Sequence, residues 1–189
     1  MNTPLLQGEL VRLVAANSET DAELFARWSR DSEYMRLQAS EPAQLWSQKQ
    51  TKEEMRKWME HEKPDTIEFV IRTVAQDRPI GSIGLDGIRW PHGDAFVGIG
   101  IGARDCWGNG YGTDAMRVIL RYAFAELNLH RVSLDVFEYN PRAIRSYEKA
   151  GFCIEGRERQ ALHRDGRRWD MIYMGILRQE WQELEGGAR

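Results

Sequence analysis

Hydrophobic and polar residues follow a period of two or a helical spacing along most of the chain, and these patterns predict its elements. Alternation predicts a strand at 9–14, and apolar residues at 22, 24, 25 and 28 predict a helix within 17–30. Residues 31–48 carry no clear pattern. A second helix is expected over 51–62, begun by a capping box of Thr51 and Glu54 and ended by Pro64.

The second half of the chain predicts more strands than helices. Strands are expected at 66–74 and 79–88, joined as a hairpin, then at 96–101, at 131–137, and on both sides of the turn Asp165-Gly166. Helices are expected at 110–127 and from Asn140-Pro141 to Gly151. The order β-α-α-β-β-β-α-β-α-β-β predicts an α+β fold with a mixed sheet, not a doubly wound parallel one.

Composition narrows the class of protein. The 189 residues suit one domain over 1–189, with a frayed tail at about 183–189, and 42% apolar with 29% charged residues is ordinary for a soluble protein. A net charge of −3 argues against a nucleic-acid partner, and Arg164, Arg167 and Arg168 are interpreted as a solvated hairpin tip. No secretion signal and no apolar run of about 20 residues occurs, so no membrane partner is expected. Cys106 and Cys153 have no metal-ligand spacing and fit a reducing cytoplasm, so no metal is expected.

The most distinctive stretch is R-D-C-W-G-N-G-Y-G-T at 104–113, which lies between a predicted strand and a predicted helix. Glycines there let a ligand approach the backbone closely, and the first N–H groups of the helix favour a pyrophosphate. A Walker loop is excluded because no Gly-Lys-Ser/Thr follows. A dinucleotide loop is disfavoured because the third glycine comes one residue early and position 128 is Asn. A purely structural turn stays open as an alternative.

The segments that follow this loop give it a chemical context. The loop, N-L-H-R-V-S-L-D-V, N-P-R-A-I-R-S-Y-E-K-A-G-F and the terminal hairpin together resemble a GNAT (Gcn5-related) N-acetyltransferase. Within that superfamily the chain most resembles the branch that acetylates ribosomal-protein N-termini and its spermidine-acetylating relatives. The resemblance covers residues 79–178 well, and residues 15–65 only by element order. It implies a twisted, mostly antiparallel sheet of about six or seven strands flanked by about four helices.

The resemblance implies acetyl-CoA as the acetyl donor, held by three groups of residues. Backbone amides of the loop would wrap the pyrophosphate, with Trp107 at a position where the family generally has Gln or Arg. Peptide groups of a splayed strand would pair with the pantetheine arm, and Asn140 would hydrogen-bond the coenzyme while also capping a helix. The expected coenzyme-binding residues are Gly100, Ile101, Gly102, Trp107, Gly108, Asn109, Gly110, Tyr111, Gly112, Thr113 and Asn140.

Acetyl transfer to an amine also needs an acid for the departing thiolate and a neutral amine. Tyr147 matches the general acid of the family; a core tyrosine is the structural alternative. Related enzymes often carry a glutamate where this chain has Phe96, so the base is unassigned. The remaining candidates are Asp94, Asp135, Glu138 and His163, each expected to be a solvated surface group.

The acceptor is a protein N-terminus or a small-molecule amine, and the sequence does not decide between them. Residues 31–50, with Trp46, Trp90, Glu33 and Glu41, are expected to help form its pocket. Arg142, Arg145 and Lys149 are interpreted as a solvated cationic face, with the CoA 3′-phosphate as the alternative. A homodimer is a further expectation. The competing function is a CoA-binding regulatory or scaffold domain that has lost catalysis.

Overall fold

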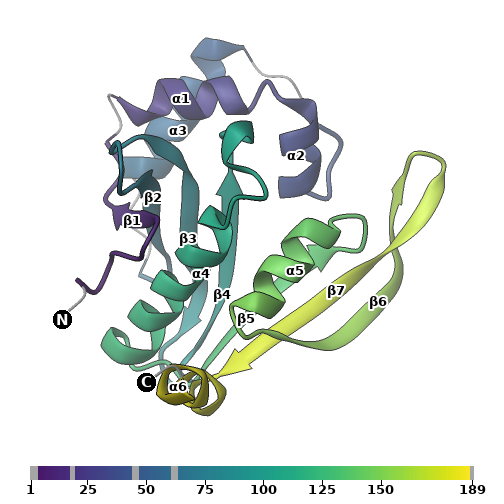
Figure 1. Ribbon diagram of the computed structural model, residues 1–189. Coiled ribbons are helices and arrows are strands. Elements are labelled where there is room, and N and C mark those ends of the chain that lie inside the picture. The colour runs from purple at the N-terminus through teal and green to yellow at the C-terminus, as the bar shows by residue number, and fades with distance from the viewer. Residues whose placement is uncertain (1–3, 18–19, 44–46, 61–63, 188–189) are drawn as a thin grey trace.

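A computed structural model describes residues 4–17, 20–43, 47–60 and 64–187 of the chain (Figure 1). The elements follow the predicted order, with two additional helices, the second and the sixth. They are β1 (Val11–Val14), α1 (Asp21–Trp28), α2 (Ser32–Gln38), α3 (Gln48–Glu60), β2 (Ile67–Thr73), β3 (Pro79–Arg89), β4 (Asp94–Ile101), a 3-10 turn η1 (Arg104–Cys106), α4 (Tyr111–Arg121), a π-helical turn η2 (Tyr122–Glu126), β5 (Arg131–Phe137), α5 (Pro141–Lys149), β6 (Cys153–Arg164), β7 (Arg167–Leu177) and α6 (Arg178–Gly187).

All seven strands join one sheet in the order β1-β2-β3-β4-β5-β7-β6, which confirms the predicted mixed α+β architecture. Every neighbouring pair is antiparallel except β4 and β5. That parallel pair is short, because only residues 94–96 of β4 face residues 131–133 of β5. The rest of β4 therefore has an open edge on the β5 side, as the splayed-strand expectation required.

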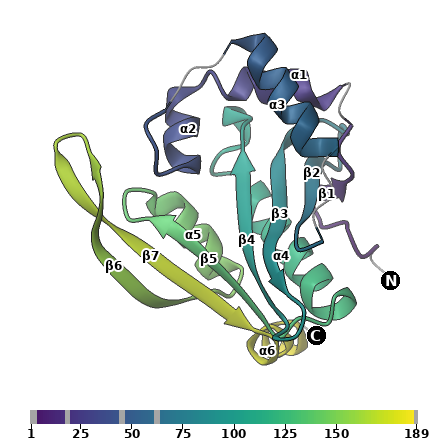
Figure 2. The same cartoon turned by 180° about the vertical axis from the view of Figure 1, so that it is seen from behind.

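The helices cover opposite faces of this sheet. Helices α4 and α5 lie in front of the strands in Figure 1, and α1 and α3 lie together at the upper end of β2 and β3 in the reverse view of Figure 2. The core between the layers includes the fully buried side chains of Ile71, Ile83, Leu85, Met116 and Ile119. No helix in the described ranges is long and apolar enough to cross a membrane. The assignment of residues 1–189 to one domain stays a prediction.

Two helix predictions in the first half were wrong in detail. Residues 32–38 form α2, which was not predicted because Tyr34 is its one buried side chain and so its apolar spacing is weak. Helix α3 begins at Gln48, three residues before the expected start. Its capping box uses Ser47 and Gln50, which exchange backbone-to-side-chain hydrogen bonds of 3.1 and 3.2 Å.

The predicted frayed tail is also corrected. Residues through Gly187 belong to α6, whose start is fixed because the Leu177 N–H donates to the Glu180 carboxylate at 2.8 Å. Trp181 stacks near Phe124 with ring centroids 5.5 Å apart. One aromatic contact and one cap thus accompany a helix that continues through Gly187, and the last two residues of the predicted tail, 188 and 189, lie outside the described residues.

The hairpin of β6 and β7 turns at Asp165 and Gly166 as predicted, and both have positive φ (53° and 73°). Arg164, however, is not a solvated tip residue. Its guanidinium donates to the backbone carbonyls of Arg36, Ala39 and Glu41, at and just after the end of α2. The solvated-tip interpretation fits Arg167 and Arg168, which are both exposed.

Candidate functional site

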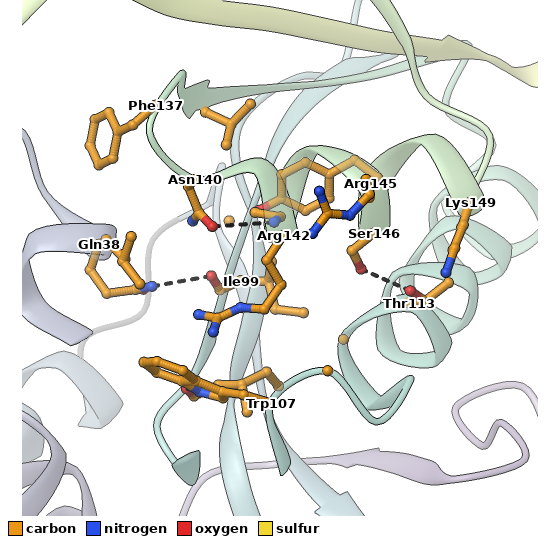
Figure 3. A pocket seen from close by; sticks show the side chains of 18 of the residues that line it. Gln38, Ile99, Trp107, Thr113, Phe137, Asn140, Arg142, Arg145, Ser146 and Lys149 are labelled. Carbon is orange, nitrogen blue, oxygen red and sulfur yellow. Dashed lines mark hydrogen bonds between the residues drawn. The ribbon is translucent and has the colours of Figure 1, made fainter. Parts of the chain in front are cut away.

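A cavity of about 460 Å³ opens where β4 and β5 diverge. Its wall is built from α2, the open edge of β4, the loop before α4, the end of β5 and one side of α5 (Figure 3). Segments from residue 34 to residue 149 therefore meet at a single place. The cavity exists because the parallel pairing stops after residue 96, so no backbone from β5 fills the edge of β4.

The loop between β4 and α4 has a backbone that requires glycine. Gly108 has φ +77° and Gly110 has φ +88°, conformations that cost other L-residues energy. Gly110 is the N-cap of α4 and has no side chain to satisfy the first N–H groups. The amides of residues 111–113, at the start of α4, are consequently donors without intrahelical partners. This arrangement favours a bound anion.

The cavity is lined by five of the seven predicted loop residues, Trp107, Gly108, Gly110, Gly112 and Thr113. The Asn109 amide instead donates to the Asp105 carbonyl at 2.9 Å, so it closes the loop upon itself. Tyr111 packs against the hydrophobic core. The side chains of these two residues are therefore structural, and only their backbone groups remain candidates for the ligand.

The open edge of β4 corrects part of the expectation for Gly100, Ile101 and Gly102. The Gly102 N–H donates to the Ile80 carbonyl at 2.9 Å, and the Gly100 carbonyl lies against Gly81, so both glycines face β3. Since peptide groups alternate along a strand, Ile99 and Ile101 face the cavity. Gly100 and Gly102 act through their missing side chains, because Tyr34 and Trp28 occupy the space of a Cβ there.

Trp107 joins this edge to α5. Its indole N–H donates to the Ile101 carbonyl at 2.6 Å, and the Arg142 guanidinium lies 3.8 Å from the centre of its ring (Figure 3). A cation over an indole face is worth about 0.5–2 kcal/mol. The Trp107 side chain, at the position where the family generally has Gln or Arg, therefore connects the loop to β4 and α5. It makes no described hydrogen bond to the backbone amides of the loop.

One hydrogen bond caps the start of α5, and another joins α5 to the start of α4. The Asn140 side chain accepts the Ala143 N–H at 3.2 Å, which caps α5 as predicted, and Asn140 also lines the cavity. The hydroxyls of Thr113 and Ser146 lie 2.8 Å apart and join α4 to α5 (Figure 3). Ser146 was not predicted; its helical spacing from Arg142 was the available clue.

The three basic residues of α5 belong to the cavity. Arg142, Arg145 and Lys149 all line it, whereas the sequence favoured a solvated cationic face. Figure 3 shows them on the cavity side of α5, spread from the Trp107 ring toward Thr113. A cationic wall beside the helix N-terminus is suited to a ligand with several negative charges.

Tyr147 lines the same cavity from α5. Burial, with a smaller effect of the Asp135 charge, raises the pKa of its hydroxyl far above the usual value. Within the described part of the chain no hydrogen bond engages this hydroxyl. Tyr147 is thus a protonated donor at neutral pH that is free to interact with a ligand.

The four candidate bases separate clearly. Asp94 is paired with Arg89, which lowers its pKa, and Glu138 accepts the Asp170 N–H at 3.0 Å. His163 is exposed near the hairpin turn and does not line the cavity. Asp135 does line it, and desolvation raises the pKa of its carboxyl.

The expected acceptor region is partly corrected. From residues 31–50, α2 contributes Tyr34, Leu37 and Gln38 to the cavity wall. Glu33 instead pairs with Arg104 at 2.8 Å, and the Trp90 indole donates to the Pro64 carbonyl at 3.2 Å. Glu41 is exposed and accepts from Ser40, while Trp46 lies outside the described residues. The described residues hold no group of three or more His, Cys, Asp and Glu arranged for a metal ion.

Comparisons with known proteins agree with this geometry. A family model described as an acetyltransferase (GNAT) domain matches residues 11–153. The chain is 33% identical over 102 residues to a Bacillus subtilis protein named "Putative ribosomal N-acetyltransferase YdaF", covering 54% of this chain and 55% of that protein. It is 35% identical over 113 residues to spermidine N(1)-acetyltransferase of Vibrio cholerae, covering 60% of this chain and 64% of that protein. These alignments thus span less than two thirds of the relatives' length.

The solved structures extend the likeness to nearly the whole chain. A spermidine N-acetyltransferase from Vibrio cholerae, crystallised in complex with CoA and spermine, superposes with a TM-score of 0.78 at 27% identity. The superposition covers 91% of this chain and 98% of that one. An acetyltransferase from Bacillus anthracis, at 21% identity and a TM-score of 0.77, shares the fold. The predicted fold is therefore confirmed.

Proposed function

The chain belongs to the acetyltransferase (GNAT) domain family, and from that membership we propose that it transfers the acetyl group of acetyl-CoA to a primary amine. The observation that carries the proposal is the convergence of three features on one cavity. These are the glycine loop with its free amides, the open edge of β4 and the protonated Tyr147. Each feature occurs in proteins of other function, and their meeting in one cavity of a chain that belongs to this family supports acetyl transfer from CoA.

The residues of the cavity fit the parts of CoA. Amides of 108–113 and the cationic residues of α5 suit its phosphates. The peptide groups of Ile99 and Ile101 suit the amides of the pantetheine arm, although Gln38 and Trp107 donate to their carbonyls in this structure, at 3.5 and 2.6 Å. The side-chain amide of Asn140 also lines the cavity and could hydrogen-bond the pantetheine arm of CoA.

The chemistry follows from the two titratable groups of the cavity. The amine gives up a proton, for which Asp135 is the acceptor, and its lone pair attacks the thioester carbonyl. The C–N bond forms as the C–S bond breaks, and the Tyr147 hydroxyl gives its proton to the departing sulfur. The second proton, released by the new amide nitrogen, restores the Tyr147 hydroxyl. A phenol with a raised pKa holds this proton at neutral pH, and a raised pKa makes the Asp135 carboxylate a stronger base than an ordinary carboxylate.

The acceptor class rests on the relatives alone. One relative is named a putative ribosomal N-acetyltransferase and another a spermidine N(1)-acetyltransferase, so a protein N-terminus and a polyamine are the two amines to test first. Phe96, which stands where related enzymes often have glutamate, is half exposed on β4 and does not line the cavity. Of the candidate bases, Asp135 lines it, and we therefore infer that Asp135 is the base. A homodimer and a cytoplasmic location stay predictions.

An acceptor screen that follows release of free CoA thiol tests the proposal. Purified protein with acetyl-CoA is mixed with spermidine, spermine, amino acids and short peptides with free N-termini, and the acetylated product is identified by mass spectrometry. We expect amine-dependent thiol release above the hydrolysis background. CoA binding without turnover on any amine would favour the regulatory CoA-binding domain, and no CoA binding would return the glycines to a structural role.

A further inference from the structure

Arg164, the last residue of β6, reaches from the β6–β7 hairpin to the C-terminal end of α2. Its guanidinium donates to the carbonyls of Arg36, Ala39 and Glu41, the last two at 2.5 and 3.0 Å. The Arg36 carbonyl belongs to the last turn of α2, where carbonyls have no intrahelical partner, and Ala39 and Glu41 follow the helix. The fork of N–H donors thus satisfies one carbonyl of the helix end and two of the segment after it. One side chain thus holds the end of α2 from a position 128 residues away in sequence.

Aromatic residues fix the orientation of this guanidinium. The Tyr139 hydroxyl donates to the Arg36 carbonyl at 2.9 Å and accepts from Arg164 at 2.5 Å. The guanidinium lies 5.5 Å from the ring centres of both Phe137 and Tyr139, which stack on each other with centroids 5.1 Å apart. The Trp169 indole donates to the Arg164 carbonyl at 3.2 Å, which holds the backbone of the same residue.

Helix α2 is short and has little buried surface, so polar contacts at its ends matter for its position. It has seven residues and buries a single side chain, Tyr34, so apolar packing holds it weakly. Yet it supplies Tyr34, Leu37 and Gln38 to the cavity, and Gln38 reaches the Ile99 carbonyl. The position of this wall is therefore set at its far end by Arg164 and Tyr139, and at its start by the Asp31–Arg104 pair.

We propose that Arg164 is a positioning residue for the acceptor side of the cavity: it holds α2 in the place from which α2 shapes the amine pocket. That this side of the cavity binds the amine rests on the proposed function, whereas the contact between Arg164 and α2 does not depend on it. The glycine loop and α5 have no described hydrogen bond to Arg164. The contact of α2 with the coenzyme side is the Gln38 hydrogen bond to the Ile99 carbonyl, at 3.5 Å, which must open before that carbonyl can meet the pantetheine arm. Loss of the Arg164 side chain should therefore affect amine binding more than coenzyme binding.

Amide hydrogen exchange tests the contact without any substrate. In Arg164→Ala, amides of residues 36–41 should exchange at least tenfold faster than in wild type, while those of β4 and α4 keep their rates. Arg168→Ala is the matched control, because Arg168 is an exposed arginine on the same hairpin. Equal exchange in Arg164→Ala and Arg168→Ala would overturn the proposal, whatever the activity of the protein.

Steady-state kinetics then test the role. Arg164→Ala should raise KM for the amine at least tenfold and change KM for acetyl-CoA less than twofold. A parallel rise in both KM values would mean a general loss of structure and contradict the proposal. If Arg164→Ala does not fold, Arg164→Lys and Tyr139→Phe replace it, since the first keeps the charge and the second keeps the ring. Each should raise KM for the amine, by less than the tenfold expected for Arg164→Ala. If no amine is acetylated, the proposed function fails and the exchange result alone decides on Arg164.

Discussion

Replacing Gly110 with alanine tests the backbone geometry of the loop. Gly110 has φ +88°, and a left-handed conformation costs an L-residue about 1–2 kcal/mol. The added Cβ itself fits, since its nearest neighbour, Leu10 Cδ1, is 3.4 Å away. The expected loss therefore comes from the dihedral angle. At roughly 2–4 °C per kcal/mol for a chain of this size, Tm should fall by about 2–8 °C.

If the loop relieves this strain by moving, the cost appears in CoA affinity instead. A penalty of about 1–2 kcal/mol corresponds to a Kd for CoA raised roughly 5- to 30-fold. Differential scanning fluorimetry and isothermal titration with CoA measure both quantities on the same variant. The loss in unfolding free energy and the loss in CoA-binding free energy should together equal the dihedral penalty of about 1–2 kcal/mol.

Gly112→Ala is the matched control. Gly112 has no positive φ, and a Cβ there would contact Ser146 Oγ at 3.6 Å and Ile101 Cγ1 at 3.9 Å, which are ordinary distances. Alanine in the first turn of α4 should leave Tm unchanged or raise it by a few degrees. A Gly110→Ala protein with the Tm and CoA affinity of wild type would contradict the prediction, as would an equal fall in Tm in both variants.

Three further predictions concern charge. The pKa of Asp31 is lowered to about 2, chiefly by the Arg104 hydrogen bond, so its ionised form stabilises the fold above pH 4 and this contribution is lost as pH falls toward 2. Asp31→Asn should therefore be less stable than wild type at pH 5 in thermal melts, with the gap closing toward pH 2, and Asp31→Ala should lose about 1 kcal/mol more with the α2 cap. Arg145→Ala with Lys149→Ala should weaken CoA about tenfold by titration and leave dephospho-CoA nearly unchanged if these residues hold the 3′-phosphate, with exposed Glu148→Gln as control. Asp135 must be ionised to act as a base, so wild-type kcat/KM should rise with pH through a pKa above the usual carboxyl value, and Asp135→Asn should lose this limb and about 100-fold in kcat; an unchanged profile would remove Asp135 from the reaction.

The sequence predicted the sheet and the loop because both rest on local signals. Alternating apolar residues mark the strands, and glycines at 108 and 110 mark backbone that other residues adopt only with strain. Asn140-Pro141 likewise predicted the start of α5, where the structure shows the side-chain cap. These features depend on a few neighbouring residues, which is why they could be predicted without the fold.

The parts that the sequence missed depend on distant contacts. Helix α2 packs through one tyrosine and is held by Arg164 from β6, so no periodicity revealed it. Asp135 stands in a strand pattern typical of a surface carboxylate, and only the divergence of β4 from β5 places it in the cavity. The direction of the Gly100 and Gly102 peptide groups depends on the register with β3, which a single sequence does not specify.

If acetyl-CoA bound beside Tyr147 gives its acetyl group to an amine, a comparison of wild type with Tyr147→Phe shows it. The assay follows CoA thiol and acetylated amine together and measures CoA affinity separately. We expect one acetylated amine per thiol released by wild type, with a fall in kcat of at least tenfold and a change in Kd for CoA of less than twofold in the variant. A Tyr147→Phe enzyme with wild-type kcat across the pH range would contradict this expectation.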